Sequence, residues 1–308
     1  MRTGVLKTEQ QNSVSADLDR LSALEIATLM NRQDASVLRA VRKTLPQIAM
    51  AIDLIRDHLA QGGRLIYVGA GTSGRIGAMD AAECPPTFGT DPSMIQFVIA
   101  GGESALARAT ESSEDSEELG ISDMAARKPG RKDIVAALSA SGRTPYTIAA
   151  LKYAAKKGAA TIAVTCNAES ELASVAQIAI EASVGPEVLT GSTRLKAGTA
   201  EKLICNMLTT GALARLGYIY DNLMSNLPLT NKKLIERGIS VIQQVAKVDR
   251  ALALSTLETA DMKVSVALVM LCARVSKSHA IRRLGRARGS VRLAIEGHQR
   301  PDASQRKA

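Results

Sequence analysis

The stretch Arg64-Leu-Ile-Tyr-Val-Gly-Ala-Gly-Thr-Ser-Gly-Arg75 joins an apolar run to a turn rich in glycine and hydroxyl side chains. The same pattern returns at Asp133-Ile-Val-Ala-Ala-Leu-Ser-Ala-Ser-Gly-Arg-Thr-Pro145. Each turn runs into a segment with helical spacing of its apolar residues. A strand, a glycine turn and a helix N-terminus present backbone N–H groups and the positive end of the helix dipole to an anion. The two stretches therefore predict a phosphorylated small molecule held between two loops of one sheet.

Apolar runs and helical patterns alternate through the middle of the chain. The expected strands are residues 64–69, 94–100, 133–139, 160–166 and 176–182, and the expected helices are 74–84, 103–127, 144–157 and 192–217. This alternation predicts a parallel sheet with helices on both faces, an α/β sandwich of the flavodoxin-like kind. Ligands of such sheets bind beyond the carboxyl ends of the strands, where both loops lie.

Both ends of the chain carry helical patterns only. Ser22-Ala-Leu-Glu25 is typical of a capping box that opens a short helix, and residues 34–60 continue with helical spacing. The C-terminal part shows four short helical patterns, at 239–248, 249–260, 262–273 and 277–296. We therefore expect a helical segment at 1–50, an α/β domain at 51–230 and a small, basic helical bundle at 231–308.

Composition and charge exclude several classes of protein. Aromatic residues make up 2% of the chain and tryptophan is absent, which disfavours nucleic acid recognition by stacking. The formal net charge of +9 comes from residues 231–308, which hold 16 Lys and Arg against 6 Asp and Glu. Such a surface can meet nucleic acid, but a solvated helical surface is the simpler interpretation, so nucleic acid is not expected as a partner. The apolar runs are short and broken by charges, so no membrane span is expected.

The cysteines and histidines offer no metal-ligand spacing. The four cysteines are widely spaced and form no C-x-x-C pair, which is typical of buried thiols in a reducing cytoplasm. The three histidines are scattered, so we expect neither a metal nor another cofactor. The first loop satisfies the dinucleotide pattern at Gly69, Gly71 and Gly74, but its intervening hydroxyls suit a terminal phosphate better. It also lacks the lysine of a P-loop, because Arg75 follows Gly74.

Two carboxylates and a third polar turn are candidates for chemistry. Glu83 precedes Cys84-Pro-Pro86, and the paired prolines predict that the helix ends there and holds Glu83 near the sheet edge. Glu114 lies in an acidic helix start, where negative charge is favourable in any case. From spacing alone, a surface acid and a helix-start charge are the simpler interpretations of these two residues. The turn at 190–199 is either a third wall of the anion site or an ordinary polar cap.

Several longer strings resemble the N-acetylmuramic acid 6-phosphate etherases, a family within the SIS (sugar isomerase) superfamily. They are TEQQNSVSADLDRLSALEI at 8–26, RLIYVGAGTSGRIGAMDAAECPPTFG at 64–89, AGGE at 100–103, SASGRTPY at 139–146 and TGSTRLKAGTAEK at 190–202. The resemblance implies an SIS-type sheet and a lyase of peptidoglycan recycling. Its reaction would split the C3 ether of N-acetylmuramic acid 6-phosphate into N-acetylglucosamine 6-phosphate and D-lactate, without a cofactor, in a cytoplasmic homodimer.

The resemblance also implies roles for particular residues. Glu83 matches the acid that protonates the leaving lactate oxygen, and Glu114 matches the base at C2. The implied phosphosugar-binding residues are Gly71, Thr72, Ser73, Gly74, Ser139, Ser141, Gly142, Thr144, Ser192 and Lys196. Glu201 departs from the family pattern, in which this position is usually Gln. Two other functions stay open: a phosphosugar-sensing regulatory protein without catalysis, and an aldose–ketose isomerase that shares the proton abstraction at C2.

Overall fold

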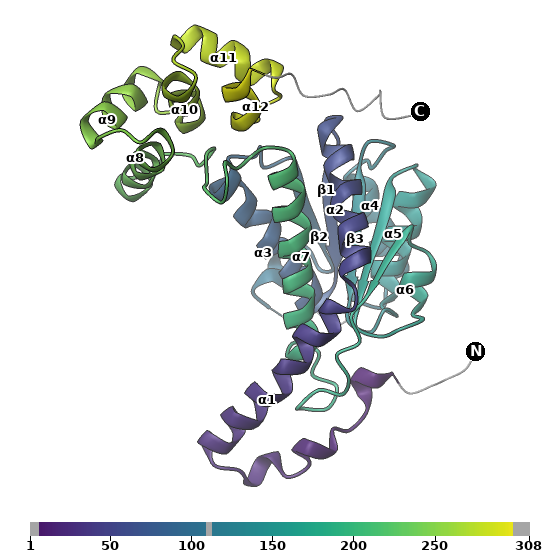
Figure 1. The fold of residues 1–308 in the computed structure, drawn as a ribbon. Coiled ribbons are helices and arrows are strands. Elements are labelled where there is room, and N and C mark those ends of the chain that lie inside the picture. The colour runs from purple at the N-terminus through teal and green to yellow at the C-terminus, as the bar shows by residue number, and fades with distance from the viewer. Residues whose placement is uncertain (1–5, 109–112, 298–308) are drawn as a thin grey trace. The chain divides into compact units, whose positions relative to one another are not determined.

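A computed structural model describes residues 6–108 and 113–297 of the chain (Figure 1). Its centre is one parallel sheet in the order β2-β1-β3-β4-β5. The strands are β1 (Leu65–Gly69), β2 (Ile95–Ile99), β3 (Ile134–Ser139), β4 (Ala160–Thr165) and β5 (Ile178–Glu181). The strand order changes direction between β1 and β3, because β2 is added on one side of β1 and the later strands on the other. Ligands of such sheets usually bind in the crevice beyond the carboxyl ends of the two strands at this switch point. The sheet confirms the predicted α/β fold class.

Helices cover both faces of the sheet. In Figure 1, α4, α5 and α6 lie on one face, and α2, α3 and α7 lie on the other. The helices and 3-10 turns up to this point are η1 (Lys7–Glu9), η2 (Ser13–Ser15), η3 (Leu18–Arg20), α1 (Ala23–Arg42), α2 (Leu45–Ala60), α3 (Gly71–Phe88), η4 (Glu103–Leu106), α4 (Glu117–Ala126), α5 (Pro145–Lys156), α6 (Glu171–Ser174) and α7 (Lys196–Arg215). All residues of β1 and β3 are buried, as expected for strands covered on both faces.

The chain forms two compact units. One holds the residues up to Ala81 together with Ser93–Thr209, and the other holds Ala82–Pro92 together with the residues from Thr210 onward. The second unit contains α8 (Lys232–Ala246), α9 (Arg250–Thr259), α10 (Val264–Cys272), α11 (Lys277–Arg286) and α12 (Val291–Glu296). Its mostly helical architecture agrees with the predicted bundle, whereas the division at residues 50 and 230 stays a prediction.

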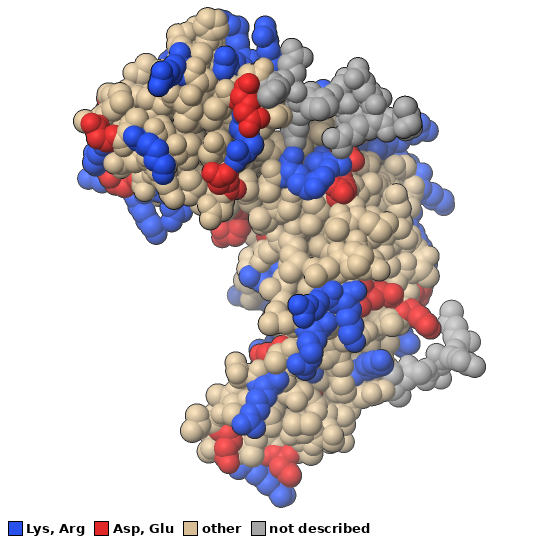
Figure 2. Space-filling model, in the orientation of Figure 1, with Lys and Arg blue, Asp and Glu red and all other residues tan. Residues whose placement is uncertain are grey.

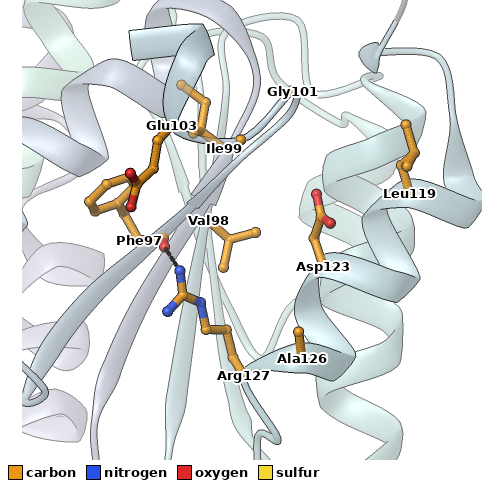
Figure 3. A pocket seen from close by; sticks show the side chains of 10 residues that line it. Phe97, Val98, Ile99, Gly101, Glu103, Leu119, Asp123, Ala126 and Arg127 are labelled. Carbon is orange, nitrogen blue, oxygen red and sulfur yellow. Dashed lines mark hydrogen bonds between the residues drawn. The ribbon is translucent and has the colours of Figure 1, made fainter.

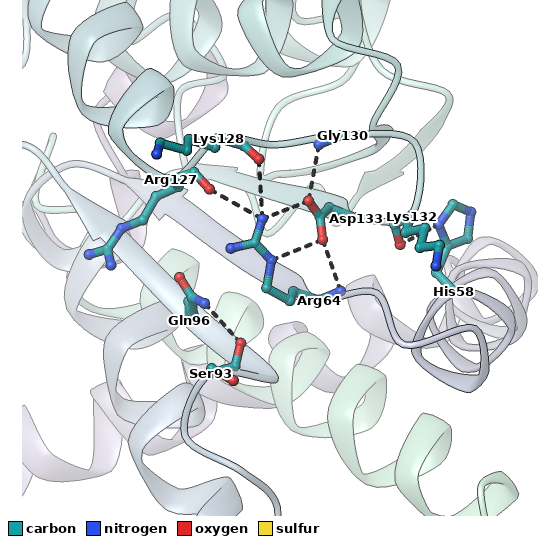
Figure 4. A network of polar contacts seen from close by, with 9 residues as sticks. All are labelled: His58, Arg64, Ser93, Gln96, Arg127, Lys128, Gly130, Lys132 and Asp133. Atoms are coloured by element: carbon teal, nitrogen blue, oxygen red, sulfur yellow. Dashed lines mark hydrogen bonds and ion pairs between the residues drawn. The ribbon is translucent and has the colours of Figure 1, made fainter.

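The starts of β1 and β3 are tied by a polar network at the end of the sheet opposite the loops (Figure 4). Asp133 accepts from the backbone N–H of Arg64 at 3.1 Å, and its Oδ2 lies 2.7 Å from the Arg64 guanidinium. Burial alone would raise the pKa of Asp133, but the bonds from Arg64 and Gly130 outweigh it and hold that pKa below its usual range. The network fixes the relative register of the two strands that carry the loops.

The largest correction to the sequence prediction concerns the end of α3. The paired prolines predict a helix stop, yet the helix continues through Pro85 and Pro86 to Phe88. Each proline removes its own N–H bond to the preceding turn, but the chain ends the helix only at Gly89, whose φ is +66°. Glu83 therefore lies within a helix and not on a turn beside the sheet edge.

Three other helix predictions need adjustment. The capping box at Ser22 and Glu25 is confirmed, although the helix it opens has 20 residues and is not short. The segment 103–127 contains η4 and α4 instead of one helix, and part of it, 109–112, lies outside the described residues. The predicted helix at 277–296 divides into α11 and α12, with Gly289 at a φ of +86° between them. A positive φ favours glycine and interrupts a right-handed helix.

The membrane and nucleic acid predictions depend on where charged and apolar residues lie in the structure. On the face drawn in Figure 2, Lys and Arg form several separate groups with Asp and Glu between them. Within the described residues, no single helix is long and apolar enough to span a membrane. The bent pair α10 and α11, at 106°, passes that test by length and composition, and residues 266–269 of α10 are buried in the core of the unit.

Candidate active site

The second loop follows β3 and gathers three hydroxyl groups at the switch point of the sheet. The Oγ of Ser139 lies 2.9 Å from the Oγ1 of Thr144 and 3.3 Å from the Oγ of Ser141. Ser139 also accepts the backbone N–H of Gly142 at 3.1 Å. Thr144 is the N-cap residue of α5, but its hydroxyl turns to Ser139 and makes no capping bond. The hydroxyls can reorient as donors toward an anion placed at the start of α5.

Gly142 lets the second loop pack closely against the next connection. Its φ is +67°, and a Cβ built on it would lie 2.3 Å from the Cβ of Ser170. Its carbonyl accepts the N–H of Leu172 at 3.0 Å. Only glycine meets both the positive φ and the close contact without strain. The loop is thus held by the backbone as well as by its hydroxyls.

The first loop ends in the N-terminus of α3. Gly71 has a φ of +52° and begins the helix, and Gly74 bonds back to the carbonyl of Ala70 at 3.1 Å. By helix geometry, the N–H groups of residues 71–73 have no carbonyl within α3 to bond. They form the expected anion-binding end of the helix. Gly74 is also needed for packing, since a Cβ there would lie 2.6 Å from the Cγ1 of Ile99.

Ser73 uses its hydroxyl differently from the serines of the second loop. It is buried, and its Oγ donates to the Oε1 of Glu201 at 2.8 Å. Burial raises the pKa of Glu201 to about 8, although the bond from Ser73 lowers it in part. Ser73 therefore contributes to the loop through its backbone, while its side chain faces the interior.

Glu114 is the carboxylate that the structure brings to the loops. A Cβ built on Gly71 would lie 2.8 Å from the Oε1 of Glu114, so this oxygen lies against the first turn of α3. The carbonyl of Glu114 accepts the N–H of Tyr146 in the first turn of α5, at 3.1 Å. Its side chain is half-buried. A half-buried carboxylate between two anion-binding helix ends is well placed to take a proton from a bound phosphorylated molecule.

Glu83 occupies a different part of α3. It follows Gly71 by twelve residues on the same helix, a separation of about 18 Å along a straight helix axis. Its side chain is exposed. Of the two carboxylates that the sequence predicted for the site, Glu114 lies against the first loop.

The third polar turn, before α7, directs its ammonium group into the fold. Ser192 lies half-exposed in the turn before α7. Lys196 is buried, and its Nζ donates to the carbonyl of Val184 at 3.1 Å. Burial lowers the pKa of Lys196, and the nearby carboxylate of Glu187 partly opposes this. The ammonium group thus lies near the end of β5. Thr72 is half-exposed in the first turn of α3.

Two buried glutamates were missed by the sequence analysis as parts of this region. Glu187 accepts the N–H groups of Lys196 and Ala197 at 3.0 and 2.9 Å and so caps the N-terminus of α7. Glu201 lies one turn further along α7 and reaches Ser73. The sequence offered a signal only for Glu201, which stands where the resembling family usually has Gln, and that signal names no partner.

A separate hollow of about 380 Å³ lies at the outer edge of β2 (Figure 3). It is lined by residues of β2, η4 and α4 and includes Glu103, Asp123 and Arg127. Two of these polar groups have partners within the fold: Arg127 donates to the carbonyl of Phe97, and Asp123 accepts from Tyr146. It is not the place where the loops meet. Within residues 6–108 and 113–297, no cluster of three or more potential metal ligands is present.

The fold and loops define the class of this protein. Residues 115–210 match the SIS domain family, and residues 47–155 match the family described as glucokinase regulatory protein N-terminal SIS domain. Among solved structures, a phosphoheptose isomerase from Francisella tularensis aligns over 62% of this chain and 100% of its own, at 18% identity and a TM-score of 0.46. A phosphoheptose isomerase from Neisseria gonorrhoeae aligns over 61% and 98%, at 16% identity and a TM-score of 0.45. The protein is an SIS-domain protein.

Relatives along nearly the full chain narrow the class further. The N-acetylmuramic acid 6-phosphate etherase of Erwinia tasmaniensis is 47% identical over 304 residues, 98% of this chain and 99% of its own. The enzyme of the same name from Clostridium beijerinckii is 45% identical over 94% of this chain and 96% of its own. This chain belongs to the family of N-acetylmuramic acid 6-phosphate etherases.

Proposed function

We propose that this protein cleaves the C3 D-lactyl ether of N-acetylmuramic acid 6-phosphate and releases N-acetylglucosamine 6-phosphate and D-lactate. Relatives 45–49% identical along nearly the whole chain carry the name of this activity. The structural observation that carries the proposal is the carboxylate of Glu114, which lies against the first turn of α3 and is bonded through its backbone to α5. A phosphate held by those helix ends would place the sugar next to a base.

The phosphate is proposed to bind at the switch point between β1 and β3. The N–H groups at the start of α3 and the hydroxyls of Ser139, Ser141 and Thr144 supply its donors. A phosphate monoester has three terminal oxygens, which suits several convergent hydroxyl and N–H donors. Because the phosphate is remote from C2 and C3, its binding orients the sugar without taking part in the reaction.

The proposed reaction is an elimination followed by an addition. In the open-chain sugar, C2 is alpha to the aldehyde, so a carboxylate can remove its proton. Loss of this proton leaves an enolate. Its electron pair then forms the C2–C3 double bond as the C3–O bond breaks, and the lactate oxygen takes a proton from a general acid. Water then adds to C3 while a proton returns to C2. Glu114 is the proposed base, and an acid or base in position contributes about 10²–10⁴-fold to such a step.

The general acid is proposed to be Glu83 of a second copy of the chain. Within one chain, Glu83 is exposed and lies twelve residues along α3 from the first loop, about 18 Å on a straight axis. Glu83 therefore does not lie at the first turn of α3, where the phosphate is proposed to bind. A homodimer in which each chain offers its exposed Glu83 to the other chain's loops would supply the missing acid.

The experiment that tests this function is the release of D-lactate from N-acetylmuramic acid 6-phosphate by the purified protein. We expect turnover with the wild type, and lactate release slowed by about 10²–10⁴-fold with Glu83→Gln or Glu114→Gln. Glu117→Gln, an exposed acid in the first turn of α4, is the matched control and should stay active. A regulatory protein without catalysis would bind the sugar phosphate and release no lactate.

Mixing the two inactive variants tests the shared site. In a mixed dimer of Glu83→Gln and Glu114→Gln chains, one of the two sites keeps both carboxylates. We expect co-expressed variants to recover about a quarter of wild-type activity, because about half the dimers are mixed and half their sites are intact. If the mixture stays inactive while mixed dimers form, the two carboxylates of a site do not come from different chains.

We also propose that the enzyme works in the cytoplasm. Its four cysteines are free thiols, and Cys84, Cys166 and Cys205 are buried. Thiols of this kind are typical of proteins in a reducing compartment. Fractionation of cells that express the tagged full chain would test the location.

A further inference from the structure

A carboxyl group lies directly behind the first loop. Glu201 is 1% exposed, and its Oε1 accepts the hydroxyl of Ser73 at 2.8 Å. Its Oε2 is buried and has no hydrogen-bond partner among the described residues. Burial without a partner favours the neutral acid over the carboxylate, because a charge there would lose its hydration.

The packing of α7 against α3 explains why Glu201 reaches the loop. A Cβ built on Gly198, one turn earlier on α7, would lie 3.4 Å from the Cγ2 of Thr72 and 3.5 Å from the Cδ1 of Ile76. At Gly198, α7 therefore lies close to the first turn of α3. From there the Glu201 side chain extends to Ser73, which belongs to the anion-binding end of α3.

Two buried thiols lie near Glu201, and the carboxyl groups of Asp80 and Glu187 lie near those thiols. Cys166, after β4, and Cys205, on α7, are both buried, and burial together with the nearby carboxyl groups raises the pKa of each thiol well above its usual value. Both stay uncharged over the pH range in which enzymes are assayed. Burial and the Ser73 bond are the two causes acting on the pKa of Glu201, which lies at about 8.

We infer that Glu201 is a positioning residue for the phosphosugar site: as a neutral acid it holds Ser73 and the first turn of α3 in place, and as a carboxylate it opposes the bound phosphate. The inference rests on the proposed function, in which that turn binds the phosphate. An anion behind the turn would face the ligand's negative charge across a poorly hydrated region, where charges interact more strongly than in water.

The sign of the pH effect follows from the protonation states. The second ionisation of a phosphate monoester has a pKa near 6, so the ligand is fully charged above pH 7. Glu201 is neutral at pH 7 and loses its proton as the pH rises through about 8. Affinity for a sugar phosphate should therefore fall on the alkaline side. By linkage, binding at pH 8 to 9 should take up a proton, because the ligand favours the neutral acid.

Calorimetric titration with N-acetylglucosamine 6-phosphate tests the inference without turnover. We expect the wild-type Kd to rise about tenfold between pH 7 and pH 9.5, with proton uptake seen as a dependence of the heat on the buffer. Glu201→Gln keeps the size of the side chain and cannot ionise, so its Kd should change less than about twofold over the same range. Glu187→Gln, which removes another buried carboxyl on the approach to α7, should keep the wild-type slope.

The opposite results would overturn the inference. An equal alkaline rise in wild type and Glu201→Gln would assign the effect to another group, and a flat wild-type profile would show that Glu201 does not influence the ligand. Circular dichroism at each pH confirms that the variants are folded. If the wild type releases lactate but its affinity for the sugar phosphate does not fall at alkaline pH, only this inference fails. If none of the three proteins binds the sugar phosphate, the proposed function fails with it.

Discussion

The two loops rich in glycine and hydroxyl residues, after β1 and β3, have similar sequences and use their hydroxyls in different ways. In the second loop, the hydroxyls of Ser139 and Thr144 lie 2.9 Å apart at the start of α5. In the first loop, the hydroxyl of Ser73 turns inward and is held by Glu201. A glycine turn with hydroxyls therefore predicts an anion site, but the surrounding fold decides which hydroxyls reach the anion and which support the loop from behind.

The largest effect is expected where the two loops meet. Replacing Glu114 by Gln should lower kcat for lactate release by about 10²–10⁴-fold, because the base at C2 is lost while both loops keep their backbone. KM should change little, since the phosphate contacts remain. Steady-state kinetics with the active Glu117→Gln control checks this. A large rise in KM with an unchanged kcat would instead place Glu114 in substrate binding.

Replacing a glycine in the second loop should destabilise the protein more than replacing a glycine in an ordinary turn. Gly142→Ala combines a positive φ with a Cβ contact of 2.3 Å to Ser170, whereas Gly185→Ala has a similar φ, +74°, and nothing within 4 Å of its Cβ. We expect the free energy of unfolding to fall by about 2–4 kcal/mol for Gly142→Ala and about 1 kcal/mol for Gly185→Ala. Urea denaturation measures both. Equal losses would show that the close packing of the second loop is unimportant.

Single hydroxyl deletions should have the smallest effects and test the difference between the loops directly. Thr144→Val should weaken binding of N-acetylglucosamine 6-phosphate by about tenfold at pH 7, the equivalent of one hydrogen bond. Ser73→Ala should weaken it less, because that hydroxyl faces Glu201.

The loss of affinity at alkaline pH gives a second measurement for Ser73→Ala. The bond from Ser73 lowers the pKa of Glu201, so its removal should raise that pKa and move the loss of affinity to higher pH. Titrations between pH 7 and pH 9.5 measure the shift. If Ser73→Ala weakens binding at pH 7 as much as Thr144→Val does, and does not change the pH at which affinity falls, the two loops use their hydroxyls in the same way.

The sheet could be predicted from the sequence because its strands are continuous apolar runs. The predicted strands at 64–69 and 133–139 begin one residue before β1 and β3 and end with them. Local pattern failed at Pro85 and Pro86, where the tertiary fold carries α3 through two residues that usually end a helix.

The orientation of the site residues depends on contacts that no local pattern contains. Ser73 and Glu201 are 128 residues apart in sequence, so nothing near the first loop shows where its hydroxyl turns. Glu114 looked like a favourable charge at a helix start, and only the packing of its segment against α3 and α5 distinguishes it. Glu83 matched the family motif, but the motif did not predict that this residue lies exposed within a helix.

Exchange of the C2 hydrogen of N-acetylmuramic acid 6-phosphate in deuterated water tests the central claim most directly. If Glu114 between the two loops is the base and Glu83 the acid, Glu83→Gln should incorporate deuterium at C2 while releasing no lactate, since removal of the proton precedes loss of the lactyl group. Glu114→Gln should show neither exchange nor release. Exchange by Glu114→Gln at the rate of Glu83→Gln would contradict the account, because the proton would then be taken by another group.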